Sequence, residues 1–198
     1  MLDADERVTP ELRIEIQNTV QIVDDRTTLF RFRRKDMLCG RWLKHSSGYP
    51  TWFGRLIRKG HVQVLREINE EYHTDGTIAF LKEHLIHFPF NKGVAYWFER
   101  HNRYSTMEAD IIVGQKSDKF SFTLSALRDP VIRRKAFKKT AYSLPFRPLI
   151  VFVYLYMIRM GFLDGVPGLS YCVLRTIYEF MIDLKVKELN IRGEKLSF

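Results

Sequence analysis

Two hydrophobic patterns divide the chain. Residues 28–88 contain short apolar runs such as TLFRFRR, WFGRLIRKG and TIAFLKEHLIHF, and Gly-containing turn signals at 59–60 and 75–76 separate them. This pattern predicts strands and hairpins, antiparallel at least in part. After Pro89 apolar residues recur at three- and four-residue spacing, which predicts helices.

A helix is also predicted near the start, because Thr9 is a good cap residue and Pro10 suits the first turn. Near residue 128 the composition shifts toward basic, aromatic and helical sequence. We therefore divide the chain into residues 1–127 and 128–198. The predicted fold class is α/β, with a mixed sheet followed by a helical, basic and aromatic C-terminal region.

The charge balance narrows the choice of partners. The 32 basic and 23 acidic residues give a net charge of +9, which favours phosphates, nucleic acid or anionic lipid. We find no nucleic-acid-binding motif, so nucleic acid is not an expected partner. The two cysteines, Cys39 and Cys172, lack the spacing of a metal site or a disulfide framework, which favours a reducing compartment.

The longest apolar run is LIVFVYLYMI at residues 149–158, which is shorter than the roughly 20 residues of a membrane-spanning helix. We interpret it as a core helix or as a segment lying in a membrane interface. Residues 128–147, directly before this run, are strongly basic, which favours an anionic bilayer surface. The alternative is a solvated basic helix followed by a buried one. The basic residues are Arg128, Arg133, Arg134, Lys135, Lys138, Lys139 and Arg147.

Asp3-Ala4-Asp5 is the first candidate for chemistry. Two carboxylates around a small residue suit a divalent cation that bridges protein oxygens and a diphosphate. The alternative is an acidic start to the following helix, where negative charge interacts favourably with the helix dipole.

Five motifs occur in a fixed order: LDADERVTPEL, GRWLKHSSGYPTWFGRLIRKG, INEE, HLIHFPF and WFERHNRYSTMEA. Together with the tail that begins YSLPFRPLIVFVYLYMIRMGF, they resemble the C-terminal two-thirds of bacterial family 2 glycosyltransferases, from residue 1 to about residue 185. The resemblance is to the branch that adds sugars to lipopolysaccharide cores or exopolysaccharides.

The resemblance implies a truncated GT-A, Rossmann-like domain over residues 1–127 and a membrane-associating helical tail over residues 128–198. The family carries nucleotide-binding βα units before the Asp-x-Asp motif, and here only Met1-Leu2 precede it. We therefore expect a fragment or split gene product that is inactive alone and would need a separate polypeptide to supply that half.

The resemblance also implies roles for single residues. Asp3 and Asp5, with Asp5 favoured as the direct contact, would hold Mg²⁺ or Mn²⁺ on the donor diphosphate, and His87 would add a ligand or touch the diphosphate. Glu70 would be the base that deprotonates the acceptor hydroxyl. The alternatives are a hydrogen-bonded core histidine at His87 and solvated loop glutamates at Glu70 and Glu71.

Trp42, Tyr49, Trp52 and Arg55 form an aromatic stretch with one arginine. Aromatic faces stack on sugars and arginine pairs with phosphate, so the resemblance makes these residues the floor of the donor or acceptor pocket. The alternative is ordinary packing within the sheet.

The function implied is an inverting, metal-dependent transfer of sugar from a nucleotide-sugar to a lipid-linked glycan acceptor. It would take place in the cytoplasm, at the anionic inner face of the cytoplasmic membrane. The alternative is a non-catalytic basic membrane module or a partner subunit of a split transferase.

Overall fold

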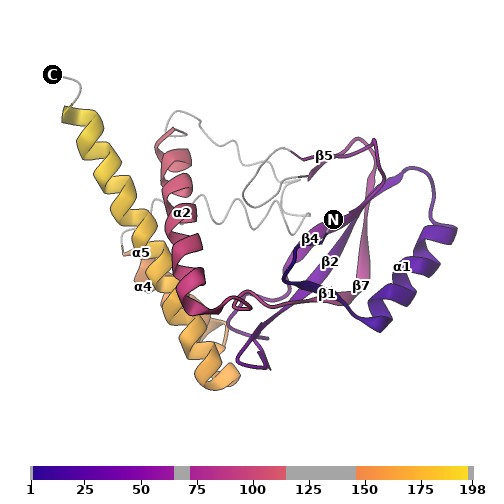
Figure 1. Cartoon of the computed structure of the whole chain (residues 1–198), viewed down its shortest axis with the longest axis horizontal. Helices are drawn as coiled ribbons and strands as arrows, with labels where there is room; N and C mark the ends of the chain where they lie inside the picture. Colours follow the sequence, from indigo (N-terminus) through magenta and orange to yellow (C-terminus); the bar gives the residue numbers. More distant parts are fainter. Residues whose placement is uncertain (1, 65–71, 115–145, 196–198) are drawn as a thin grey trace. The chain divides into compact units, whose positions relative to one another are not determined.

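The structure is a computed structural model that describes residues 2–64, 72–114 and 146–195 (Figure 1). Contacts divide the chain into two compact units, which we call the sheet unit and the helical unit. The sheet unit comprises Met1–Lys44 and Gly48–Asn91, and the helical unit comprises His45–Ser47 and Lys92–Phe198. The boundary predicted between residues 127 and 128 lies outside the described residues and stays a prediction.

The sheet unit contains a mixed five-stranded sheet in which β1, β7, β2 and β3 are neighbours in that order and β4 also pairs with β2. β7 and β2 are parallel, and the other pairs are antiparallel. The predicted α/β class with a mixed sheet is therefore confirmed. The strands are β1 (Glu6–Val8), β2 (Thr27–Leu38), β3 (Arg41–Trp42), β4 (Trp52–Ile57) and β7 (Thr77–His87), and a separate antiparallel pair joins β5 (Gln63–Val64) to β6 (Tyr72–His73).

Helix α1 (Pro10–Ile22) covers the sheet beside β7 and β2 (Figure 1). It begins where the sequence predicts, since the Thr9 hydroxyl accepts a hydrogen bond from the Leu12 amide at 3.1 Å. Leu12 is fully buried and joins the core of the unit. The other core residues are Phe30, Phe32, Leu81 and Leu85.

An irregularity in β7 is stabilised by α1. Pairing with β2 shifts register where Arg31 and Arg33 face Phe80 and His84, so β7 carries extra residues there. The Glu15 carboxylate of α1 accepts hydrogen bonds from the Lys82 and Glu83 amides, at 2.7 and 2.8 Å. These amides therefore keep partners beside the irregularity, and the register of the rest of β7 is fixed.

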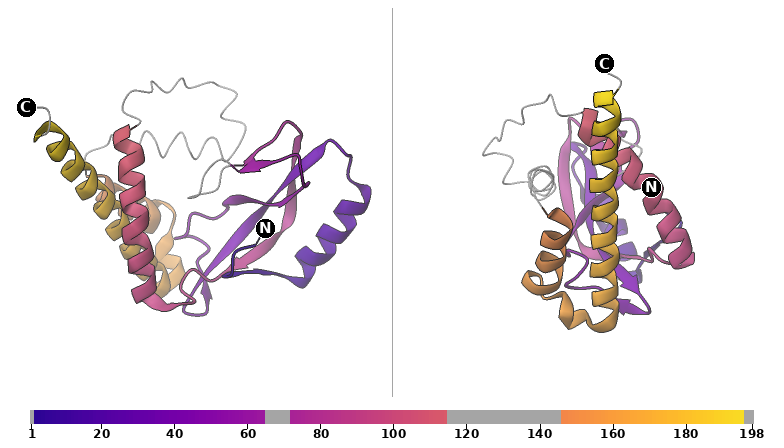
Figure 2. Two further views of the ribbon diagram at one scale, coloured as in Figure 1. Left: turned by 45° about the horizontal axis from the view of Figure 1, so that its top comes forward. Right: turned by 90° about the vertical axis from the view of Figure 1, so that its left-hand side faces the viewer.

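The helical unit contains α2, α5 and a short hairpin arm before α5, which confirms the predicted helical C-terminal region (Figure 2). No single described helix is long and apolar enough to cross a membrane. The segments Arg147–Ile158 and Gly161–Gly193, which meet at a bend of 70°, reach that length and composition only when taken together. The elements are α2 (Gly93–Gly114), α4 (Arg147–Val153), the π-helical turn η3 (Tyr154–Ile158), the 3-10 turn η4 (Gly161–Asp164) and α5 (Gly165–Lys195).

Aromatic stacking and one lysine join α2 to α5. The His101 ring stacks on Trp97 with centroids 3.7 Å apart and meets the Tyr178 ring edge-on at 5.0 Å. These rings therefore pack α2 against α5. Burial lowers the pKa of His101 to about 4, so the ring is neutral at pH 7. The Lys185 ammonium donates to the Asn102 carbonyl and to three side chains of α2, each at 2.7 to 2.8 Å.

We predict that Gly76→Ala destabilises the sheet unit by about 1–3 kcal/mol. A Cβ at this position would lie 2.6 Å from the Arg26 carbonyl oxygen and would also meet the Thr28 side chain, so the start of β2 or β7 must move. Urea denaturation followed by tryptophan fluorescence measures the loss. Gly193→Ala is the control, because a Cβ there meets nothing within 4 Å and alanine favours a helix. Equal stability of the Gly76 variant and the wild type would contradict the prediction.

Candidate active site

Asp3-Ala4-Asp5 forms a turn that leads into β1. The Glu6 amide donates to the Asp3 carbonyl at 3.0 Å, and the Asp3 amide donates to the Glu6 carboxylate at 3.2 Å. β1 and a cap residue separate this turn from α1, whose first helical residue is Pro10. The interpretation of the acidic pair as a helix start is therefore wrong.

The register of three strands places three titratable residues in one row. Glu6 of β1 is the partner of His87 in β7, and His87 is the partner of Asp36 in β2. Neighbouring strands lie about 4.8 Å apart, so side chains in such a row reach one another. Asp5 directly precedes β1, so the pairing of β1 with β7 also brings Asp5 close to His87.

His87 lies between two carboxylates and is 8% exposed. Its Nδ1 is 2.7 Å from Asp36 Oδ1, and its Nε2 is 3.4 Å from Asp5 Oδ2. A carboxylate only accepts hydrogen bonds, so Nδ1 donates to Asp36 and the Nε2 side is directed toward Asp5. His84 is used differently: its Nε2 is 2.7 Å from the Tyr49 hydroxyl.

Arg55 of β4 pairs with two carboxylates. Its Nη2 lies 2.6 Å from Asp3 Oδ2, and its Nε lies 3.0 Å from Glu6 Oε2. The Glu6 side chain has no exposed surface, so this pairing compensates a fully buried charge. Burial would lower the pKa of Arg55, but the hydrogen bond and charge of Glu6, followed by the charge of Asp3, raise it above its usual value.

Arg34 of β2 connects the Arg55–Glu6 pair to the Asp36–His87 pair. Its Nε lies 3.0 Å from Asp36 Oδ1, and its Nη1 lies 3.6 Å from Glu6 Oε1. Burial opposes ionisation of Asp36, but the charge of Arg34 and the hydrogen bond from His87 hold the pKa of Asp36 below its usual value. We call the whole arrangement the charge network. In order along the contacts, its members are Asp3, Arg55, Glu6, Arg34, Asp36, His87 and Asp5.

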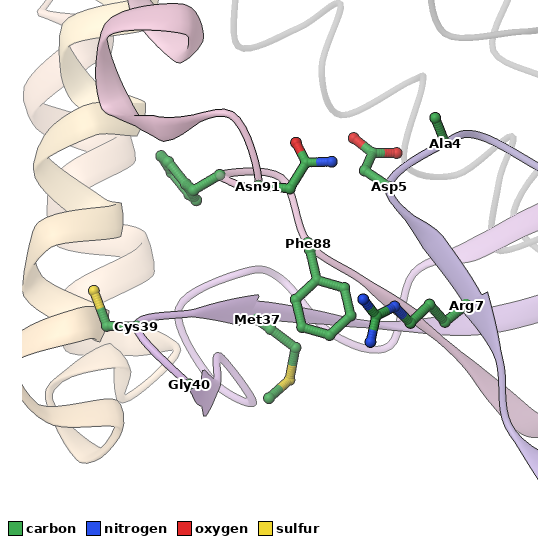
Figure 3. A pocket seen from close by; sticks show the side chains of 9 residues that line it. Ala4, Asp5, Arg7, Met37, Cys39, Gly40, Phe88 and Asn91 are labelled. Carbon is green, nitrogen blue, oxygen red and sulfur yellow. The ribbon is translucent and has the colours of Figure 1, made fainter.

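A pocket of about 220 Å³ opens beside Asp5 (Figure 3). The Asp5 carboxylate and the Asn91 amide lie toward one side of it, and the Phe88 ring and the Met37 side chain line another (Figure 3). Arg7 lies over the Phe88 ring, 4.9 Å from its centroid. The pocket is smaller than the roughly 300–1,000 Å³ that encloses a drug-sized ligand, so it suits one polar group or one ring. Its other lining residues are Ala4, Cys39, Gly40 and Phe90.

Asp5 and His87 fit a divalent cation by the chemistry and spacing of their donor atoms. At metal–ligand distances of about 2.0–2.1 Å, adjacent donors of an octahedral shell lie about 3 Å apart, close to the 3.4 Å between Asp5 Oδ2 and His87 Nε2. The bond from His87 to Asp36 is typical of a metal-ligating histidine. Within the described residues no group of three His, Cys, Asp or Glu converges on one point, so substrate oxygens or water would complete the shell. Asp3 would have to share its carboxylate with Arg55.

The predicted substrate-binding aromatics pack against cations and other rings of the sheet unit. Trp42 meets the Tyr49 ring edge-on at 5.2 Å, and Lys35 lies 4.7 Å from the Trp42 ring centroid. Trp52 meets the Phe80 ring at 4.9 Å and has Arg33 at 5.4 Å. Of the predicted site residues that the structure describes, Asp5 lines the pocket, whereas these aromatics lie outside its lining. Their role in substrate binding stays a prediction.

Sequence reasoning missed Glu6, Arg34 and Asp36, which hold the predicted ligands in place. The available signal was Asp36 itself, an acidic residue within the basic strand sequence RFRRKDML. Glu70, the predicted base, lies outside the described residues.

Compared with known proteins, the chain matches no protein-family model, and no solved structure matches it significantly.

We predict that Arg55→Met destabilises the sheet unit by about 3–5 kcal/mol, because it leaves the buried Glu6 without its closest cation. Urea denaturation at pH 7 measures the change. Arg58→Met is the matched control: Arg58 pairs with Asp25, which is 94% exposed, so its loss should cost less than about 1 kcal/mol. Equal effects of the two substitutions would show that the charge network does not stabilise the fold.

We also predict that Asp36→Asn removes a pH-dependent part of the stability. The pKa of Asp36 is lowered on folding, so its contribution is complete above about pH 4 and is lost as the pH falls through the folded-state value. The difference in free energy of unfolding between wild type and variant should therefore shrink from pH 7 to pH 3. A difference that stays constant or grows on acidification would contradict the assignment.

Proposed function

We propose that the sheet unit carries part of a glycosyltransferase site. The reaction is transfer of a sugar from a nucleotide-sugar to a lipid-linked glycan acceptor in lipopolysaccharide or exopolysaccharide biosynthesis. The observation that carries the proposal is the placement of Asp5 and His87 within 3.4 Å of each other at a pocket, with Asp36 orienting the histidine. The sequence resemblance described above supplies the reaction class.

A divalent cation bound by Asp5 and His87 would offset the charge that develops on the departing diphosphate. The chain's own residues prepare this position. Asp36 accepts a hydrogen bond from the Nδ1–H group of His87, which leaves Nε2 available as a ligand. Arg55 and Glu6 hold the turn in place through Asp3.

The pocket lining suits a small polar group attached to a sugar. Phe88 and Phe90 offer aromatic surface for the apolar face of a sugar ring, and the Asn91 amide offers a donor and an acceptor for hydroxyl groups. At about 220 Å³ the pocket holds part of a donor, either a phosphate or one sugar ring. Glu70 is proposed as the base for the acceptor hydroxyl.

We predict that Asp5→Asn lowers sugar transfer by at least about 100-fold, because a neutral amide replaces the charged carboxylate that would bind the cation. The assay incubates the full chain and Mn²⁺ with a panel of UDP-, GDP- and ADP-sugars and with a crude extract of a strain that lacks this chain. The extract supplies the membrane acceptor and the separate polypeptide that carries the nucleotide-binding half. Transfer is read as label in the lipid fraction. Asp25→Asn is the matched control, since the Asp25 carboxylate is exposed and pairs with Arg58 at the surface.

Asp36→Asn tests the orientation of His87 separately. Because Asp36 acts through His87, we expect transfer to fall by about 10–100-fold and the Mn²⁺ concentration for half-maximal rate to rise. A purely structural role would lower the rate without moving the Mn²⁺ dependence. If adding the wild-type chain to the extract increases transfer from none of the donors, the proposed function is wrong. The alternative is then a non-catalytic membrane module, which the exposed apolar residues of the helical unit favour.

A further inference from the structure

An exposed apolar stripe runs along the arm formed by α4 and η3. Its members recur at intervals of three and one residues, the spacing of one helical face, whereas Val151, Phe152, Leu155 and Tyr156 between them are half-buried or buried. Single exposed hydrophobic residues are ordinary on protein surfaces, but a continuous row of seven is not. The stripe consists of Phe146, Leu149, Ile150, Val153, Tyr154, Met157 and Ile158.

Charged residues are almost absent around the stripe. Between Arg147 and Arg175 the sequence contains two charged residues, Arg159 and Asp164. Asp164 is 2% exposed, and Arg159 is half-buried at the turn. After the turn, α5 also exposes apolar residues at helical spacing: Val166, Leu169 and Val173. A surface of this composition favours a nonpolar environment over water.

The arm is held by buried polar contacts at both ends, at Arg147 and at Asp164. At its start, the Arg147 guanidinium donates to the Glu179 carbonyl at 3.0 Å and lies 3.0 and 3.1 Å from the Glu179 and Asp183 carboxylates. At the turn, Asp164 Oδ2 accepts hydrogen bonds from the His45 amide and from the amide and hydroxyl of Ser46. The apolar surface runs along the side of the arm, and the turn itself also exposes Met160, Phe162 and Leu163.

We propose that this stripe is a membrane-docking surface that lies in the plane of a bilayer, with its side chains at the boundary of head groups and acyl chains. Residues 148–158 span about 17 Å as a helix, too short for a hydrocarbon core of about 30 Å. Because the stripe runs along the length of the arm, the arm lies on the bilayer with these side chains about 5–10 Å deep. The inference does not require the proposed sugar transfer.

Charge favours a bilayer over a second copy of the chain as the occupant. The net charge is +9, and the sequence RRKAFKK at residues 133–139 precedes the stripe closely. Anionic lipid head groups complement this charge, whereas two copies would bring like charges together.

The test is flotation of the full chain with vesicles, at low and high NaCl concentration. One set contains phosphatidylcholine alone, and the other also contains phosphatidylglycerol. We expect the wild type to bind both sets and to stay bound at high salt. The combined substitution of Leu149, Val153 and Ile158 by Gln should lower binding to phosphatidylcholine vesicles by more than about tenfold.

The matched control replaces Ile14, Val20 and Ile22 by Gln, since these residues are also exposed on a helix, α1 of the sheet unit. It should bind as the wild type does. Circular dichroism checks that both variants fold, and the salt resistance of the wild type tests the proposal without any variant. Absence of wild-type flotation, loss of binding at high salt, or equal loss in the control would overturn it. So would a dimer that the stripe variant disperses while vesicles bind nothing. Flotation needs no sugar donor, so its outcome is independent of transfer activity.

Discussion

The alternating order of charge from Asp3 to Asp36 is the constraint on which the sheet unit depends. Charges removed from water destabilise a fold unless opposite charges and hydrogen bonds replace the lost hydration. Glu6 has no exposed side-chain surface and Arg55 has 7%, so neither is tolerated without the other. β1, β2, β4 and β7 each contribute at least one member of the charge network, so slippage of any one strand by a residue would leave a buried charge unpaired.

This constraint also shapes the chemistry of the candidate active site. The two ends of the charge network are Asp3 and Asp5, the carboxylates predicted to hold a cation, and they differ in their surroundings. Asp3 is already paired with a guanidinium at 2.6 Å, whereas Asp5 faces the Nε2 side of a histidine at 3.4 Å. A cation beside Asp5 would have Asp5 and His87 as ligands, and the hydrogen bond to Asp36 orients the His87 ring. Asp5 is therefore the better placed of the two for this predicted role.

The sequence predicted what depends on local pattern. The runs around Phe30, Phe53 and Phe80 became β2, β4 and β7, and Thr9 with Pro10 located the start of α1. It did not predict the pairing of Glu6, His87 and Asp36, because that row depends on the register between strands up to 81 residues apart. Arg55 shows the same limit. From sequence it is a free cation suited to phosphate, and the fold surrounds it with carboxylates that lie about fifty residues away.

Both units use one physical device, a buried arginine between two carboxylates, with different consequences. In the sheet unit Arg55 links β4 to β1, while α1, β2 and β7 supply a core that includes Leu12, Phe30 and Leu85, so the arginine adds to a sheet that already has apolar contacts. In the helical unit Arg147 ties α4 to α5, although Leu155 is the buried apolar residue that α4 and η3 contribute. Polar contacts at both ends can hold the arm while its apolar face stays outward. The exposed part of that face gains nothing from folding of the described residues, and this is the physical reason for proposing a bilayer as its environment.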